Sequence, residues 1–344
     1  MANMTSKTST TPSIHNPRTW RYVRYLALIA ILAVLPLLMP SNYYRQIFNQ
    51  IVIFVILALG YDLVLGRLGQ LSFGQIGLFA IGAYASALLT TRLHAPFLVG
   101  MLGAAVAGGF AGAMIGIPAL RIKGHYLVLL TLAFGEMVVL LLNNLGGLTG
   151  GSQGISEIPA PSIGPLHFAS RQSLSYLLLA FAVLAVLGIV MIDRSRFGRA
   201  FVAVKDAELA ADVSGVNLAS TKILAFVISA VYAGLAGGLY AHTFRYVSPE
   251  FFGLGLTISL LAMVLLGGRG SIVGVVMGVV VLTLLPESLR FVKQYYMLVF
   301  GLGIWLLVMF LPGGLVSIIP YFRGTHGRYR NRVRALMAAR DERA

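Results

Sequence analysis

The feature that most restricts the fold of this chain is a succession of apolar segments that carry almost no charge. About 20 residues of α-helix are enough to cross the hydrocarbon core of a bilayer. Candidate spans lie at Tyr25–Pro40, Ile47–Gly66, Leu68–Thr91, Phe97–Leu120, Tyr126–Leu145, Leu174–Ile192, Ile223–Thr243, Phe251–Gly268, Ser271–Leu289 and Tyr295–Tyr321. The sequence therefore predicts an all-α fold, a polytopic membrane helix bundle of about ten transmembrane helices, with a range of roughly eight to eleven.

The composition excludes several classes of protein. Of the 344 residues, 58% are apolar and only 11% are charged, which is too little charge for the surface of a soluble fold. Membrane topology and attraction to anionic lipid headgroups explain the net charge of +15, so we expect lipid contacts and no nucleic-acid partner. Because the six histidines are scattered and cysteine is absent, we expect no metal site and no cofactor.

The distribution of basic residues predicts the topology. Most of the 26 Lys and Arg residues fall in segments that lie on one side of the membrane if the N-terminus is cytosolic. We expect a cytosolic polar tail at 1–24, a transmembrane domain at 25–321 and a cytosolic Arg-rich tail at 322–344. Both termini are thus predicted to be cytosolic.

A mixed-charge segment, 193–222, is expected to form a cytoplasmic loop. It contains five basic and four acidic residues, and Arg199–Val213 can form a short helix that Gly215 ends. Such a helix is either a solvated connector or a docking surface, and its composition does not decide between them.

Glycines spaced four apart indicate closely packed helices. They form two ladders, Gly108, Gly112, Gly116 and Gly270, Gly274, Gly278. The 267–270 segment between two spans either turns tightly or runs through the membrane as a broken helix.

Two acidic residues lie inside predicted spans, where ionisable groups are costly. Asp62 is about one turn from the cytosolic end of its helix, so we expect it to reach water and to be structural. Glu136 is nearer the middle of its span. An interhelical contact and a place on a transport pathway are equally compatible with its position.

Several sequence segments together resemble one family, the permeases of branched-chain amino-acid ABC importers, and within it the LivM class. The segments are LGRLGQLSFGQ at 65–75, IGAY at 81–84, TLAFGE at 131–136, LTGGSQGI at 148–155, RSRFGRA at 194–200, AADVSGVN at 210–217, AGLAGGLY at 233–240 and LLGGRGSIVG at 265–274. Their order and spacing carry the resemblance from about residue 50 to 315.

The resemblance implies a multi-pass subunit of a bacterial inner membrane. It implies as partners a second homologous permease, two ATP-binding subunits and a periplasmic substrate-binding protein. The chain has no Gly-Lys pair and hence no P-loop, so ATP hydrolysis would occur on other chains and this one is not expected to be an enzyme.

Position within the family pattern makes the Arg196–Gly215 region the coupling helix. Its expected coupling residues are Arg196, Gly198, Arg199, Lys205, Asp206, Glu208 and Gly215. A route for Leu, Ile or Val needs apolar walls with a few polar or helix-end groups. The candidates for this pathway are Ser72, Gln75, Glu136, Thr149, Gly150, Gly151 and Gly154.

Two other functions remain open. A permease for urea or short amides would share much of this pattern, because the binding protein sets the substrate. An ion-coupled secondary transporter would use Asp62 and Glu136 as a relay and would need no partner ATPase.

Overall fold

A computed structural model describes residues 41–288 apart from 121, 123, 165 and 169, together with Gly301. The predicted span Tyr25–Pro40 and the tails 1–24 and 322–344 lie outside the described residues. The same holds for Tyr295–Tyr321 apart from Gly301. The described residues therefore do not include all of the roughly ten transmembrane helices that the sequence predicts.

Helices dominate the described residues. The long ones are α2 (Asn42–Asp62), α4 (Phe97–Ala119), α5 (His125–Asn144), α7 (Arg171–Arg194) and α10 (Leu218–Phe244). The shorter ones are α3 (Gln75–Thr91), α6 (Gly146–Thr149), α8 (Arg196–Asp206), α9 (Glu208–Val213), α11 (Leu254–Gly267) and α12 (Ile272–Ser288). Single turns are η1 (Leu63–Arg67, a π-helix), η2 (Gly151–Gln153) and η3 (Pro249–Phe252).

Five of the described helices are long and apolar enough to cross a membrane: α2 together with η1, and α4, α5, α7 and α10. Helices α3, α11 and α12 are apolar but shorter. A two-stranded antiparallel hairpin of β1 (Ser162–Ile163) and β2 (Leu166–His167) is the one sheet within the described residues. The fold is thus that of a helical membrane protein.

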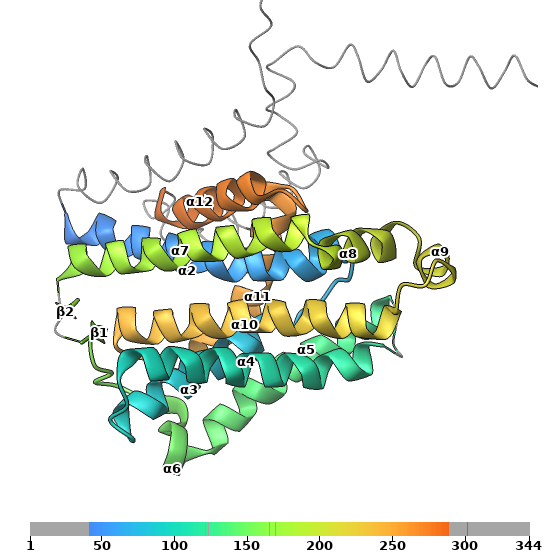
Figure 1. Cartoon of the computed structure of the whole chain (residues 1–344). Coiled ribbons are helices and arrows are strands. Elements are labelled where there is room, and N and C mark those ends of the chain that lie inside the picture. Colours follow the sequence, from blue (N-terminus) through green and yellow to red (C-terminus); the bar gives the residue numbers. More distant parts are fainter. Residues whose placement is uncertain are drawn as a thin grey trace, which may run out of the picture.

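Helix α10 lies at the centre of the bundle. It packs against α4 and α3 on one side and against α2 on the other, and α7 packs on α2 (Figure 1). The α11–α12 hairpin packs on α2, with α12 along the outer face in Figure 1. Helices α8 and α9 lie at one end of the bundle, and the β1–β2 hairpin lies at the opposite end.

The close approach of α4 to α10 depends on glycine. A Cβ on Gly108 would lie 2.5 Å from the carbonyl oxygen of Ala230, and one on Gly112 would lie 2.3 Å from Cβ of the same alanine. Gly116, one turn further along, lies against Ile223. The ladder at 108–116 therefore faces α10, where small residues allow the two backbones to approach.

The second ladder differs from the expectation. Gly278 lies against α11, where an added Cβ would be 2.0 Å from the carbonyl oxygen of Met263, and Gly274 contacts Gly267. Gly270, however, is not on a helix face. It lies in the tight turn between α11 and α12 with φ +76°, a left-handed conformation that glycine adopts without a steric penalty. The chain therefore turns at 268–271 and does not continue as a broken membrane helix.

Two predicted helices are shortened or divided in the structure. The span expected at Leu68–Thr91 is helical only from Gln75, because Gly69 adopts φ +78° and Ser72 bonds to the amide of Gly74. The cytoplasmic helix expected at Arg199–Val213 is divided into α8 and α9. It starts earlier, because the Ser195 hydroxyl accepts from the amides of residues 197 and 198, and it is interrupted at Ala207, which has extended backbone.

Candidate functional site

The α8–α9 segment projects at one end of the bundle and is anchored along one side. Phe201 is fully buried and Val204 is nearly so, whereas Phe197 and Val202 are exposed. Helix α8 therefore packs one side on the protein, and Phe197 and Val202 leave two large apolar side chains exposed on either side of that packed face. Exposed apolar side chains on a short charged helix suit contact with another protein.

Helix α9 continues this surface. Leu209 and Val213 are 81% and 91% exposed, which is unusual for large aliphatic side chains on a helix of six residues. The Nζ of Lys222 lies 2.7 Å from a carboxylate oxygen of Glu208, and this ion pair joins α9 to the start of α10. The outward apolar residues are thus held on a fixed helix.

Most of the predicted coupling residues lie on this projecting segment. Those exposed to solvent are Arg196, Arg199, Lys205, Asp206 and Gly215, while Gly198 is buried and Glu208 is half-buried. Gly215 has φ +85° and follows α9, as the predicted stop does. Gly198 packs closely against the end of α7, because an added Cβ there would lie 2.4 Å from the carbonyl oxygen of Ile192.

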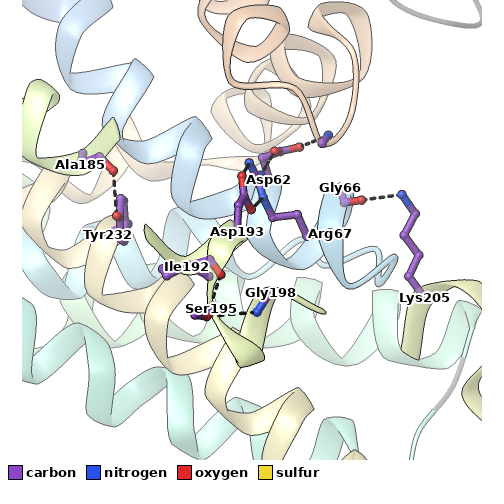
Figure 2. Close-up of polar contacts among 11 residues, drawn as sticks. Asp62, Gly66, Arg67, Ala185, Ile192, Asp193, Ser195, Gly198, Lys205 and Tyr232 are labelled. Atoms are coloured by element: carbon purple, nitrogen blue, oxygen red, sulfur yellow. Dashed lines mark hydrogen bonds and ion pairs between the residues drawn. The ribbon is translucent and has the colours of Figure 1, made fainter. Parts of the chain in front are cut away.

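A buried ionic network lies beneath α8. The guanidinium of Arg67 contacts carboxylates from two different helices, Asp62 on α2 and Asp193 on α7 (Figure 2). The Arg67–Asp193 contact is bidentate, with Nε to Oδ1 at 2.5 Å and Nη2 to Oδ2 at 3.0 Å. The other carboxylate oxygen of Asp62 accepts from the amide of Gly270 over 2.8 Å.

Asp62 therefore does not reach water, and the expectation that it would is wrong. Its side chain is fully buried, and its two oxygens bond to Arg67 and to the α11–α12 turn. Burial of this carboxylate is compensated by a cation and an amide donor, which is the usual requirement for charge inside a membrane protein.

Two of the predicted pathway residues bond within the bundle. Ser72 is buried, and its hydroxyl accepts from the amide of Gly74 while its carbonyl accepts from Tyr61. Gln75 is buried and bonds to Ser229 on α10 through both ends of its amide. Their side chains thus stabilise the start of α3 and its packing on α10.

The predicted turn at 149–154 has a local role in the structure. The Thr149 hydroxyl donates to the carbonyl of Leu142 over 2.6 Å and accepts from the amide of Gly151. Gly150, Gly151 and Gly154 all have positive φ, and a Cβ on Gly154 would lie 2.0 Å from the carbonyl oxygen of Val247. This turn is packed against the segment that follows α10.

Glu136 lies apart from the other candidates. It is on the exposed side of α5, next to Met137, and among the described residues no hydrogen bond joins it to Ser72 or Gln75. Helix α5 is also the least buried of the five long helices: 22% of its most apolar 18-residue stretch is buried inside the protein, against 83% for α2 with η1. Asp62 and Glu136 are thus not brought together into a relay.

A cavity opens between α8 and the start of α5. It has a volume of about 430 Å³ and is lined by the 68–71 segment, Gly124, His125, Leu127, Val128, Val204, Lys205 and Glu208. Within the described residues, no three His, Asp or Glu side chains are grouped so that they could hold a metal ion. The described part of the site thus offers contact surfaces and a cavity, without a grouping of side chains that could hold a metal ion.

Sequence reasoning missed the pairing of Arg67 with Asp193, the ion pair of Lys222 with Glu208, and Ser229. In the sequence, Arg67 stands between the predicted spans Ile47–Gly66 and Leu68–Thr91, which indicates only a basic residue in a cytosolic turn. The nearby Asp62, five positions earlier, was the available signal, because a buried acid in a membrane helix requires a partner. No local pattern pointed to Asp193, which is distant in the sequence.

Comparison with known proteins places these features in one family. A family model described as the permease component of branched-chain amino acid transport systems matches residues 43–315. The high-affinity branched-chain amino acid permease protein LivM of Salmonella typhimurium is 35% identical over 303 residues, which cover 81% of this chain and 71% of that protein. The LivM protein of Escherichia coli is 35% identical over 290 residues, covering 78% of this chain and 68% of that protein.

More distant similarity extends to another import system. The autoinducer 2 import system permease protein LsrC of Yersinia pestis is 31% identical over 268 residues, which cover 73% of this chain and 72% of that protein. No solved structure matches the chain significantly.

Proposed function

Because the chain belongs to the family of permease components of branched-chain amino acid transport systems, we propose that it forms one half of the membrane pathway of an ATP-driven importer of Leu, Ile and Val. Separate ATP-binding subunits hydrolyse ATP, and a second permease completes the pathway. A periplasmic binding protein delivers the substrate. The chain lies in the bacterial inner membrane with both termini in the cytosol.

The observation that carries the proposal is the projecting α8–α9 segment. Its exposed apolar residues, Phe197, Val202, Leu209 and Val213, stand among exposed charges on one rigid support. Interfaces typically combine such an apolar centre with a polar rim. We assign this surface to an ATP-binding subunit, because α8 and α9 lie in the predicted cytosolic loop.

The second permease is expected to cover α5. A glutamate on the exposed side of a membrane helix is costly in lipid, so Glu136 needs a protein partner or water. A route between two permeases meets that requirement. Leu140 and Leu141, both exposed on the same helix, supply the apolar wall that an aliphatic side chain needs.

The cavity beside α8 would be the cytosolic end of this route. Its lining combines Leu127 and Val128 with the charged groups of Lys205 and Glu208. A zwitterionic amino acid with an aliphatic side chain requires both kinds of contact. Motion of α8 would therefore alter the shape of this opening directly.

In the mechanism, closure of the ATP-binding subunits moves α8 and α9 and shifts the bundle between outward-facing and inward-facing states. The partner can shift this equilibrium only by binding one state more tightly than the other. This chain contributes the surface that receives the movement and the helices that respond to it.

Co-purification and uptake test the proposal. Gentle extraction from native membranes should recover the chain with ATP-binding subunits and a second permease. Proteoliposomes that contain this complex should take up radiolabelled leucine only with ATP and the binding protein. Uptake of urea or acetamide in place of leucine would assign a different substrate, and uptake driven by an ion gradient without ATP would exclude the importer.

A further inference from the structure

The last turn of α7 and the C-terminal end of α8 are both attached to η1, the turn that follows α2. Near the N-terminus of α8, Asp193, two residues before the capping Ser195, forms the bidentate contact with Arg67. At its C-terminal end, Nζ of Lys205 donates to the carbonyl oxygen of Gly66 over 2.7 Å (Figure 2). Gly66 and Arg67 both belong to η1, so one five-residue turn contacts α7 just before α8 begins and α8 near its end.

The turn that holds α8 is itself unusual. Isolated π-helical turns are rare and occur mostly at functional sites. Gly66 lies at the C-terminal end of this helical segment, where carbonyl groups lack a partner within the helix, and its carbonyl accepts from Lys205. The five residues of η1 are buried, and α2 continues from this turn deep into the bundle.

The same network reaches a third element. Asp62 bonds to Arg67 with one oxygen and to the amide of Gly270 with the other, which connects α2 to the turn between α11 and α12. Gly66 permits this approach, because a Cβ there would lie 2.0 Å from Oδ1 of Asp62 and 2.6 Å from the Gly270 nitrogen. Asp193, Arg67, Asp62 and Gly270 thus form a continuous chain of contacts.

The charges make this chain of contacts stiff. Two carboxylates share one guanidinium; Arg67 and Asp62 are within 5% of complete burial, whereas the Asp193 side chain is 38% exposed. Separating the buried Arg67–Asp62 pair costs far more than separating an exposed pair, and the bidentate geometry of the Arg67–Asp193 contact fixes the orientation of the other pair. A displacement of α8 is therefore more easily passed to α2 and to the α11–α12 turn than absorbed between them.

On the premise of the proposed function, we propose that Arg67 is the positioning residue that transmits movement of α8 into the membrane. The ATP-binding subunit pushes on the outer face of α8. The clamp, defined as Arg67 with Asp193 and Lys205 with Gly66, moves α8 and η1 as one body, and Asp62 carries the movement to the α11–α12 hairpin.

The test uses the whole importer in proteoliposomes with Asp193→Asn and Arg67→Lys. Asp193→Asn keeps the shape but removes the charge, and Arg67→Lys keeps the charge but removes the bidentate fork. We expect unchanged co-purification of ATP-binding subunits and a fall of about fivefold or more in leucine transported per ATP hydrolysed, the lower range of coupling between distant sites. Arg171→Lys is the matched control, since Arg171 lies exposed at the other end of α7.

The possible outcomes separate the clamp from the proposed function. Normal transport per ATP in both variants would overturn the transmission role while leaving docking intact. Loss of ATP-binding subunits from the Asp193→Asn complex would also overturn it, because Asp193 would then act on docking itself. Failure of the unaltered complex to contain ATP-binding subunits would refute the proposed function instead.

A cysteine pair provides a second measurement, because the chain contains no cysteine. A Cβ at Gly69 would lie 3.5 Å from Cβ of Lys205, within the range of a disulfide. Gly69→Cys with Lys205→Cys should transport poorly when reduced, because the lysine bond is lost and because cysteine is strained at the left-handed backbone of Gly69; Gly69→Cys alone measures the second effect. Oxidation should restore transport per ATP if α8 and η1 move together. If oxidation instead blocked transport, α8 and η1 would have to separate during the cycle, and the clamp would be overturned.

Discussion

Gln75 and Ser229 bond to each other in both directions. Nε2 of Gln75 donates to the backbone carbonyl of Ser229 over 3.2 Å, and the Ser229 hydroxyl donates to Oε1 of Gln75 over 3.0 Å. Both residues are buried, and the pair joins the first turn of α3 to the middle of α10. Gln75, which was predicted to lie on the substrate pathway, therefore uses its side chain to join two helices.

We expect Gln75→Leu to lower the stability of the complex by about 1–3 kcal/mol, because it leaves buried polar groups of Ser229 without a partner. Combining it with Ser229→Ala should cost less than the sum of the two single variants. Thermal unfolding in detergent measures both effects, with Ser259→Ala as the control, since this half-buried serine on α11 bonds only within its own helix. An additive double variant, or a raised KM for leucine at unchanged stability, would contradict a purely structural role.

The contact between α4 and α10 predicts a strong effect at Gly234. A Cβ there would lie 2.2 Å from the carbonyl oxygen of Ala104, and backbone cannot yield as a flexible side chain can. Gly234→Ala should destabilise the protein by about 1–3 kcal/mol through overpacking. Gly255→Ala should have little effect, since an added Cβ there meets no atom within 4 Å. Equal melting temperatures for the two variants would refute the packing argument.

The membrane helices could be predicted because hydropathy is a property of each segment alone. The starts of α2, α7 and α10 depend also on caps at Ser41, Ser170 and Asn217, which lengthen the helices beyond the apolar blocks. The structure nevertheless shortens one predicted span at Gln75. In that case, the positive φ of Gly69 outweighs an apolar pattern that would suit a longer helix.

The candidate site was less accessible to sequence reasoning. The α8–α9 segment could be located from its charges and its resemblance to a known family, although the interruption at Ala207 could not. Two contacts of the ionic network could not be identified, because Asp193, which bonds to Arg67, and Gly270, which bonds to Asp62, are both distant in sequence from their partners. Contacts between helices decide whether a polar residue faces a pathway or another helix, and no local pattern reports them.

Docking of an ATP-binding subunit on α8 and α9 predicts specific losses. Charge reversal at Arg199 and Lys205 together should reduce co-purification, but Lys205 also bonds to Gly66, so the effects must be separated. Arg199→Glu combined with Leu209→Ser avoids that contact. We expect binding of the ATP-binding subunits to weaken about fivefold or more, as for loss of central interface residues.

Membrane insertion should be unaffected in this variant, because both side chains are exposed and outside the predicted spans. Ser220→Ala, an exposed change near the start of α10, is the matched control. The affinity of the ATP-binding subunits for the purified permease pair, immobilised on a surface, would show whether they dock on α8 and α9. Normal binding and normal uptake in the Arg199→Glu/Leu209→Ser variant would show that the ATP-binding subunit docks elsewhere.

The last prediction concerns Glu136 on the exposed side of α5. A carboxylate there is costly against lipid, so we expect it to face the second permease or a water-filled route in the assembled importer. Glu136→Gln keeps the shape and most hydrogen bonding while removing the ionisable group. Glu136→Leu removes both and suits lipid. Uptake of leucine and recovery of the second permease, measured on the same preparations, separate the roles of this residue.

If Glu136 lines the substrate route, we expect both variants to assemble normally and to lose uptake, with KM for leucine raised more in Glu136→Leu than in Glu136→Gln. Retained uptake in Glu136→Gln with loss of the second permease in Glu136→Leu would instead assign a hydrogen bond at the interface between permeases. Met137→Leu, an apolar exchange at the neighbouring exposed position, is the control for disturbance of this face. Full uptake and full assembly in both Glu136 variants would mean that this side of α5 is neither the route nor the interface, because a functional carboxylate at either place cannot be replaced by leucine without cost.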